Sequence, residues 1–283
     1  MAELTPMMKQ YFEIKDKTED CILFYRLGDF YEMFYDDAIL ASKELDLTLT
    51  GRDCGQEERA PMCGVPFHSC ESYIARLVKK GFKVAICEQT EDPALAKGLV
   101  KREVVRIITP GTVIESNMLD DGKNNYIASM LFCDKKTGVC FADISTGDVF
   151  CTVLDTAEPQ LIINELGKFS PKEALMSKEI YDNKEISYFL STRLSCMRNK
   201  LNDDYYDEKK CADVIKNHFK SDVSDVLNNN VLIKTLGSLL IYLYQTQKTS
   251  LSHINNLQLY TTKQYMEIDT FTRRNLELCE NIK

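Results

Sequence analysis

The stretch that decides the fold of the first part of this chain runs from Cys21 to Glu32 and reads CILFYRLGDFYE. Its first seven residues are apolar and aromatic enough for a buried strand. Gly28 and Asp29 then interrupt the apolar run, as the residues of a tight turn do. Asp29 is a natural N-cap, and with Glu32 three residues later it has the form of a capping box, so the pattern predicts a helix over residues 31–47.

The segments after this helix alternate between loop, helix and strand patterns up to residue 115. This alternation predicts one α/β domain over residues 1–115, and the polar segment 116–125, which has no apolar period, is the expected linker. In order, the segments are a polar loop, a loop punctuated by Pro and Gly, a helix and two strands, over residues 50–59, 60–68, 69–80, 82–88 and 104–109.

A second α/β domain is expected over residues 126–245, because strand patterns come first there and helical patterns follow. The remaining residues, 246–283, hold a strand-like piece at 257–268 and a helix start at Thr272, and we expect them to be the beginning of a third domain. The chain is therefore expected to be a fragment. The strands of the second domain are predicted over 126–133, 138–144 and 149–154, and its helices over 159–169, 209–219 and 231–247.

The composition is that of an ordinary globular protein, with 283 residues, 44% of them hydrophobic, which is enough for about two domains. The sequence contains no apolar stretch of the length of a membrane helix and no signal peptide, so we expect a cytoplasmic protein with no membrane contact and with its eleven cysteines reduced. The formal net charge of -8 argues against attraction of the whole surface to nucleic acid. A polyanion partner would need a local basic patch, and residues 76–106 supply one, with eight basic residues against four acidic ones.

Phe30 and Glu32 place a large aromatic ring and a carboxylate just after the turn. One interpretation is structural: Phe30 is a core residue and Glu32 completes the capping box. The other is functional. Phe24, Phe34 and Tyr35 already supply inward-facing aromatic rings, so Phe30 is free to project from the domain.

The motif Gly28-Asp29-Phe30-Tyr31-Glu32 resembles the Phe-x-Glu motif of the MutS family of DNA mismatch recognition proteins. The resemblance is strong over residues 1–115, weaker in the middle and strong again at the end, and several separate motifs occur in the order that the family has them. The further stretches that resemble the family are TPMM at 5–8, FYR at 24–26, FYDDA at 34–38, PMCGVPFH at 61–68, VAICEQ at 84–89, VRIITPGT at 105–112 and TRRNLE at 272–277.

The resemblance implies a mixed-sheet α/β mismatch-binding domain, then a ribonuclease H-like α/β connector domain, then the start of a core domain. It further implies that Phe30 is a wedge that enters the minor groove and stacks on a mispaired or unpaired base, and that Glu32 hydrogen-bonds that base. Gly28, Asp29 and Tyr31 would support these two residues. Such a site measures how easily DNA bends instead of reading its sequence, because a wedge is cheaper to insert where pairing is already damaged.

Phosphate contacts are expected from the basic run and from the loop around Phe67, although a charge run is also typical of a solvated face. Small residues in that loop would let a sugar-phosphate strand approach closely. The candidates for contact with the DNA backbone are Arg52, Pro66, Phe67, His68, Lys79, Lys80, Arg102 and Arg106.

The sequence is also compatible with three other classes of function. Cys54, Cys63, His68 and Cys70 lie close in sequence but lack the spacing of a zinc site, so we expect free thiols and no metal. A ribonuclease H-like fold would also suit a metal-dependent nuclease, with Asp134, Asp143 and Glu165 as its carboxylates. A module that binds only proteins is the third alternative, and it predicts no role for Phe30.

No Gly-x4-Gly-Lys-Ser/Thr motif occurs in the sequence, so we expect this chain to be no enzyme and to hold no cofactor. The resemblance implies that an ATPase domain which binds ATP and Mg²⁺ lies beyond Lys283, together with the surface for dimerisation with a second copy. The partners it implies are double-stranded DNA with mismatches or small loops, and MutL.

Overall fold

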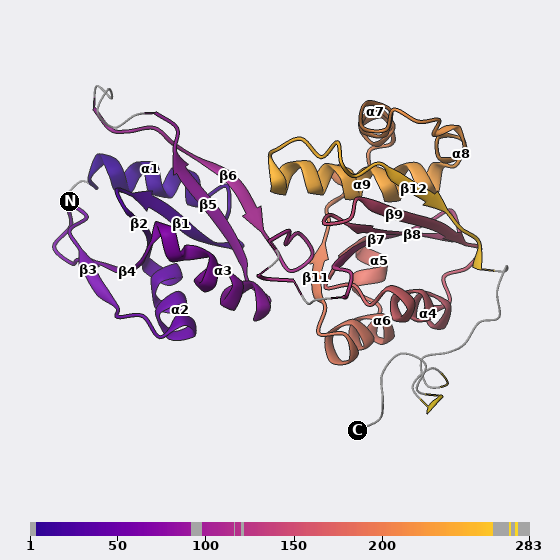
Figure 1. Cartoon of the computed structure of the whole chain (residues 1–283), viewed down its shortest axis with the longest axis horizontal. Helices are drawn as coiled ribbons and strands as arrows, with labels where there is room; N and C mark the ends of the chain where they lie inside the picture. The colour runs from indigo at the N-terminus through magenta and orange to yellow at the C-terminus, as the bar shows by residue number, and fades with distance from the viewer. Residues whose placement is uncertain are drawn as a thin grey trace. The chain divides into compact units, whose positions relative to one another are not determined.

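The computed structural model describes residues 4–91, 98–115, 117–119, 122–262, 272 and 275–276. The chain divides into two units, each with its own sheet (Figure 1). The first unit comprises Met1–Pro110 and Thr246–Lys248, and the second comprises Gly111–Gln245 and Thr249–Lys283. The break after Pro110 lies a few residues before the linker that the composition predicts over 116–125. Of the strand-like piece expected at 257–268, the first residues belong to strand β12, Asn256–Leu259, and residues 263–268 lie outside the described residues. Of the helix expected to start at Thr272, only residues 272, 275 and 276 are described.

The first unit is a six-stranded mixed sheet in the order β3-β4-β2-β1-β5-β6. Strand β1 is parallel to β5, and the other neighbours are antiparallel. Figure 1 shows α1 on one side of this sheet and α2 and α3 on the other. The elements are α1 Pro6–Lys15, β1 Cys21–Leu27, β2 Phe30–Phe34, α2 Tyr35–Leu45, β3 Thr50–Arg52, β4 Ala60–Pro66, η1 Phe67–Ser69, α3 Cys70–Lys79, β5 Lys83–Gln89 and β6 Arg102–Ile108.

The second unit is a six-stranded mixed sheet in the order β11-β10-β7-β8-β9-β12, with an apolar core on each face. Helices α7, α8 and α9 cover one face, and α4, α5 and α6 cover the other (Figure 1). The elements are β7 Tyr126–Cys133, β8 Lys136–Asp143, β9 Asp148–Leu154, α4 Pro159–Phe169, β10 Glu173–Met176, α5 Lys178–Tyr181, α6 Lys184–Tyr188, η2 Phe189–Arg193, β11 Met197–Lys200, η3 Asp203–Tyr206, α7 Glu208–His218, α8 Ser224–Leu227, α9 Asn230–Gln247 and β12 Asn256–Leu259.

The α/β class with mixed sheets is therefore confirmed, and so is the three-strand meander β7-β8-β9 with the helices that follow it. In the part of the chain that the structure describes, no helix combines the length and apolar character needed to cross a bilayer.

The helix expected over 31–47 is wrong in its first turn. Residues Phe30–Phe34 form strand β2, and helix α2 begins only at Tyr35, without a side-chain cap on its first turn. Asp29 is therefore not an N-cap, and Glu32 closes no capping box. Strand β2 forms because it is hydrogen-bonded on both sides, to β1 and to β4, and because Tyr31 and Met33 alternate into the core.

The two loops expected over 50–68 are wrong in part, because they contain strands β3 and β4. Pro and Gly in this segment are typical of turns and loops, which is why the sequence predicts no strand there. They are accommodated in strand β4, which lies between β2 and β3 in the sheet. Pro66 lies opposite Phe30 in this ladder, and Gly64 lies opposite Glu32.

Candidate nucleic-acid interface

Phe30 lies at the tip of a two-residue hairpin between β1 and β2. Leu27 and Phe30 are paired across the turn, and Gly28 has φ +56°, a conformation that favours glycine. The Phe30 side chain is 46% exposed, whereas the next residue, Tyr31, is 5% exposed. The expectation that Phe30 projects from the domain is confirmed, although strand alternation produces this exposure and not the first turn of a helix.

Glu32 lies on the same face of the sheet as Phe30, because side chains two residues apart in a strand share a face. Tyr25, which pairs with Glu32, shares this face too and packs against Tyr11 of α1 with 5.6 Å between ring centroids. Phe30 and Glu32 therefore lie on the face that carries α1. The carboxylate of Glu32 forms an ion pair with the guanidinium of Arg52, so two of the predicted site residues are in direct contact.

The opposite face of the hairpin carries a second group of contacts. The guanidinium carbon of Arg26 lies 3.8 Å from the centre of the Phe67 ring and 5.4 Å from that of Tyr31. The Tyr31 hydroxyl donates to the carboxylate of Glu88, which also lies 3.9 Å from Arg26. Burial raises the pKa of Tyr31, and its hydrogen bond to Glu88 raises the pKa further. Tyr31 therefore remains a neutral donor that fixes the strand behind Phe30.

The segment Pro66 to His68 lies beside the hairpin. The backbone nitrogen of Phe67 donates to the carbonyl oxygen of Asp29 at 2.9 Å. The side-chain Nε of Arg26 donates to the carbonyl oxygen of Gly28 at 2.6 Å. Phe67 is 41% exposed, His68 is exposed and Pro66 is half-buried. The segment Pro66 to His68 therefore lies next to the hairpin turn, with the Phe67 ring against Arg26 on the face opposite Phe30.

The basic candidates are distributed differently. Lys79 is exposed, and Lys80 pairs with Glu44 at 2.7 Å. Arg102 is only 7% exposed, and it donates to the carbonyl oxygens of Arg26 and Val100 and to Gln10. Arg106 is half-buried and donates to Gln247 at 3.1 Å. The guanidinium of Arg102 thus makes its hydrogen bonds inside the first unit, so Arg102 is a poor candidate for contact with the DNA backbone.

The positive excess counted over residues 76–106 is reduced by carboxylates from elsewhere in the sequence. Ion pairs join Arg76 to Asp46, Lys83 to Asp20 and Lys101 to Glu103. Two of these three acidic partners lie outside the counted run. A charge count along the sequence misses such partners, so the basic patch is weaker than the count predicts.

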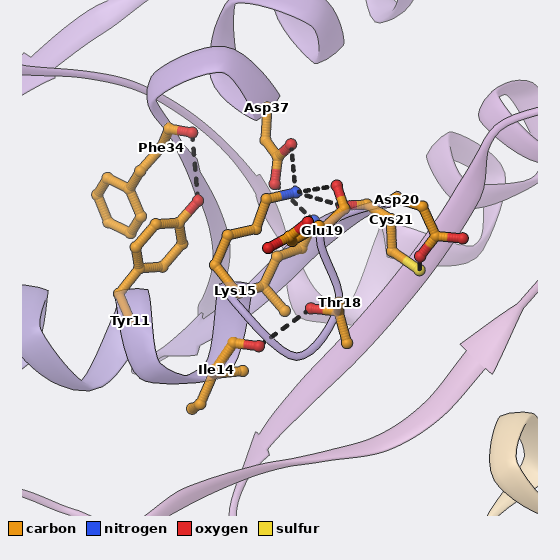
Figure 2. A network of polar contacts seen from close by, with 10 residues as sticks. Tyr11, Ile14, Lys15, Thr18, Glu19, Asp20, Cys21, Phe34 and Asp37 are labelled. Carbon is orange, nitrogen blue, oxygen red and sulfur yellow. Dashed lines mark hydrogen bonds and ion pairs between the residues drawn. The ribbon is translucent and has the colours of Figure 1, made fainter.

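A polar network at the open end of the hairpin, away from its turn, fixes α1, β1 and α2 to one another (Figure 2). The ammonium of Lys15, at the end of α1, lies 2.9 Å from Asp37 and donates to the carbonyl oxygen of Cys21 at 2.6 Å. The second carboxylate oxygen of Asp37 accepts from the backbone nitrogen of Leu23 at 2.9 Å. Burial raises the pKa of Asp37, and these donors oppose that rise. The Tyr11 hydroxyl donates to the carbonyl oxygen of Phe34 at the end of β2 (Figure 2).

The carboxylates considered for a nuclease have separate roles. Asp143 is buried and accepts from Ser145 and from the backbone nitrogen of Asn125. Glu165 pairs with Lys168 and accepts from Tyr260, and Asp134 is an exposed turn residue. Within the described ranges, no three His, Cys, Asp or Glu side chains are grouped as metal ligands. Cys54, Cys63 and Cys70 are free thiols.

Two residues of this region, Arg26 and Gly64, are not among the predicted site residues, although both occur in stretches that resemble the family. Arg26 lies within an apolar run, and its position there was a signal that it has a specific partner. The sequence pattern predicts a loop at Gly64. It lies opposite Glu32, and an added Cβ there would be 3.5 Å from the Cγ of Glu32 and 3.2 Å from the carbonyl oxygen of Tyr31.

Two family models together match most of the chain. Residues 5–117 match the family model described as MutS domain I, and residues 125–255 match the model described as MutS domain II. The chain therefore belongs to the MutS family.

Relatives with the same name cover the whole chain. It is 50% identical over 284 residues to the DNA mismatch repair protein MutS of Acetivibrio thermocellus, which covers 100% of this chain and 33% of that protein. It is 49% identical over 286 residues to the protein of that name from Lachnoclostridium phytofermentans, covering 100% of this chain and 30% of the relative. The chain thus spans about a third of the length of the curated relatives it matches.

Proposed function

We propose that this chain recognises mismatched or unpaired bases in double-stranded DNA and so serves DNA mismatch repair. The observation that carries the proposal is the exposure of Phe30, 46%, at the tip of a hairpin whose other aromatic side chains, Phe24, Tyr25, Tyr31 and Phe34, are buried. A large apolar side chain held out by a well-packed strand is suited to insertion into another surface. The names of the relatives point to DNA as that surface.

Phe30 would act as a wedge in the minor groove. Inserting an apolar side chain between stacked bases costs about a few kcal/mol, because the bases lose their stacking and the duplex kinks. A mismatched or unpaired base has already lost part of this stabilisation. The wedge therefore enters damaged pairs at lower cost, and this difference gives specificity without reading the sequence.

Glu32 would provide the second part of the discrimination. It shares a face of the sheet with Phe30, so a base that stacks on Phe30 comes within reach of the carboxylate. A carboxylate close to phosphates is unfavourable unless it finds a hydrogen-bond donor. An unstacked base offers such a donor, and an intact pair does not.

Contacts to the sugar-phosphate backbone would come from the exposed part of the same region. Phe67 and His68 are exposed, and Pro66 is half-buried and lies opposite Phe30. Lys79 and Lys80 lie at the other end of α3 from this segment, so they would reach only a more distant part of the DNA backbone. Such contacts fix the register of the protein on the duplex and carry no sequence information.

The remaining activities are proposed for a full-length MutS protein that includes this chain. In that protein an ATPase domain would bind ATP and Mg²⁺, a second copy would complete a dimer, and MutL would be the protein partner. The chain itself would be a recognition module without catalytic residues.

The proposal is tested by comparing full-length MutS that carries this chain with its Phe30→Ala variant. The dissociation constants are measured for a duplex with one mismatch and for its fully paired counterpart. We expect the variant to bind both duplexes with similar affinity, because without the wedge no base is unstacked within reach of Glu32. Phe67→Ala is the matched control, since it removes another exposed ring from the same unit, and it should weaken both affinities in parallel. Unchanged discrimination in Phe30→Ala would contradict the proposal.

A further inference from the structure

The pair formed by Glu32 and Arg52 carries an inference beyond the wedge. Arg52 lies on β3, at the edge of the sheet, and pairs in register with Ala60 of β4. Glu32 pairs with Gly64 of the same strand. Ala60 and Gly64 are four residues apart and face the same side of β4. Arg52, Glu32 and Phe30 therefore share one face of the sheet.

The surroundings of the pair leave it accessible from that face. The Glu32 side chain is 14% exposed and that of Arg52 is 36% exposed. Gly64, directly opposite Glu32, contributes no side chain that would cover the carboxylate. The carboxylate is thus held against the sheet by the guanidinium, while the guanidinium itself is open to an approaching ligand.

We propose that Arg52 determines specificity as a built-in counter-ion that DNA must displace before Glu32 reaches a base. This inference rests on the proposed function of Phe30 and Glu32. A guanidinium binds phosphate and carboxylate with similar bidentate geometry, so a phosphate of the duplex competes directly with Glu32 for Arg52. When Arg52 turns to the phosphate, Glu32 loses its partner.

The consequence differs between the two kinds of duplex. In a mismatched duplex an unstacked base provides a donor that replaces Arg52 at the carboxylate. In a fully paired duplex no such donor is present, so the carboxylate either stays with Arg52, which then contributes no phosphate contact, or remains unpaired among phosphates. Arg52 therefore lowers the penalty that Glu32 imposes on a fully paired duplex, and its loss would enlarge the difference in affinity between the two duplexes.

A simple phosphate contact by Arg52 would give a different result. Loss of such a contact weakens binding about equally for every duplex and reduces the dependence on salt. A purely structural role would lower the stability of the first unit and leave the ratio of the two affinities unchanged. Only the exchange couples Arg52 to Glu32 in the discrimination itself.

The experiment is a double-mutant cycle in full-length MutS that carries this chain, with Arg52→Gln, Glu32→Gln and the double variant. The probes are a duplex with one unpaired thymidine and its fully paired counterpart. The readout is the discrimination ratio, which is the dissociation constant of the paired duplex divided by that of the duplex with the unpaired thymidine. When Glu32 is unchanged, Arg52→Gln leaves its carboxylate without a counter-ion. Binding of the paired duplex is then weakened more than binding of the duplex with the unpaired thymidine. We expect this variant to raise the ratio about 3- to 10-fold, a coupling usual for residues in contact. In the Glu32→Gln background the same substitution should leave the ratio unchanged.

Two further variants complete the design. Arg52→Lys keeps the charge and should restore most of the wild-type ratio, which separates the counter-ion role from a loss of folding. Arg76→Gln is the matched control, because it removes the exposed pair with Asp46 in the same unit, and it should leave the ratio unchanged. Equal effects of Arg52→Gln in both backgrounds would overturn the inference. If Phe30→Ala abolishes discrimination while the cycle shows no coupling, this inference fails and the proposed function stands; if Phe30→Ala leaves discrimination intact, the proposed function fails.

Discussion

Arg26 stacks on Phe67, with its guanidinium carbon 3.8 Å from the centre of the ring. The same guanidinium donates to the carbonyl oxygen of Gly28 in the hairpin turn. These contacts join the β1–β2 hairpin to the segment that follows β4. Phe30 is therefore supported from behind by a residue that the sequence pattern did not mark as functional.

We expect Arg26→Met to destabilise the chain by about 1–2 kcal/mol, because it removes a cation–π contact and a charged hydrogen-bond donor but keeps the apolar stem. Urea unfolding of the 283-residue chain measures this change. The loss should be smaller in a Phe67→Leu background, since one of the two contacts is then already absent. Equal losses in both backgrounds would show that the stacking on Phe67 contributes nothing.

Gly28→Ala tests the turn that presents Phe30. The φ of +56° at Gly28 is unfavourable for alanine by about 1–2 kcal/mol, and an added Cβ would meet nothing within 4 Å, so strain and not collision is the cause. Gly81→Ala is the control, with φ +86° and open space at an unrelated turn. Both variants should lose stability in urea, and only Gly28→Ala should also reduce discrimination between mismatched and paired duplex. Reduced discrimination in both would contradict a specific role for this turn.

How much of this region could be predicted from the sequence depends on how far apart in sequence the interacting residues lie. The turn at Gly28 is encoded by the residues of the turn itself, and the sequence predicts it correctly. Strand β2 is stabilised by pairing with β4, about thirty residues away, and a local pattern at Asp29 and Glu32 imitated a helix cap. The ion pair of Glu32 with Arg52 likewise joins distant segments, so the sequence indicated both residues but not their contact.

The sequence also overestimates the basic patch over residues 76–106, because here too the partners come from distant segments. Asp20 and Asp46 neutralise Lys83 and Arg76, and both acidic residues precede the run in the sequence. In contrast, the meander β7-β8-β9 was predicted well, because each of its strands pairs with its neighbour in sequence and the turns between them are short.

Lys15→Met tests the network of Figure 2. It removes the cation beside Asp37, whose side chain is 9% exposed, and should destabilise the chain by about 3 kcal/mol at neutral pH, as expected when one partner of a buried pair is lost. Lys83→Met is the control, because its partner Asp20 has a side chain that is 67% exposed, and should cost less than about 1 kcal/mol.

The deficit of Lys15→Met should depend on pH in a defined direction. Burial raises the pKa of Asp37 in the folded state, and loss of Lys15 raises it further. A carboxyl whose folded pKa lies above its unfolded pKa stabilises the fold at low pH, and this stabilisation is lost as the pH rises through the folded pKa. Urea unfolding should therefore show a larger deficit at neutral pH than under acidic conditions. A deficit that grows on acidification would contradict this account of Asp37.

Glu173→Gln tests how the second unit fixes its first residues. The buried carboxylate of Glu173 accepts from the backbone nitrogen of Gly111 at 3.0 Å, from Asn199 at 2.6 Å and from Tyr242 at 2.6 Å. An amide nitrogen in place of one oxygen would face a donor, so we expect a loss of about 2–3 kcal/mol. Tyr242→Phe removes one donor only and should cost about 1 kcal/mol. Thermal unfolding of the chain compares the two, and equal losses would argue against the carboxylate as the centre of this network.

The central claim is that the ring at position 30 stacks on a base of damaged DNA, and the absence of tryptophan from this sequence allows a direct measurement. Phe30→Trp places one indole at the tip of the hairpin, and Phe67→Trp places one on the neighbouring exposed ring as a control. Each variant of the 283-residue chain is titrated at low salt with a duplex that contains one mismatch and with its paired counterpart, while anisotropy of a dye on the DNA reports binding. We predict that the mismatched duplex quenches the indole at position 30 far more than the paired duplex does, and that the indole at position 67 does not distinguish them. Bound mismatched DNA that leaves the fluorescence at position 30 unchanged would contradict the claim.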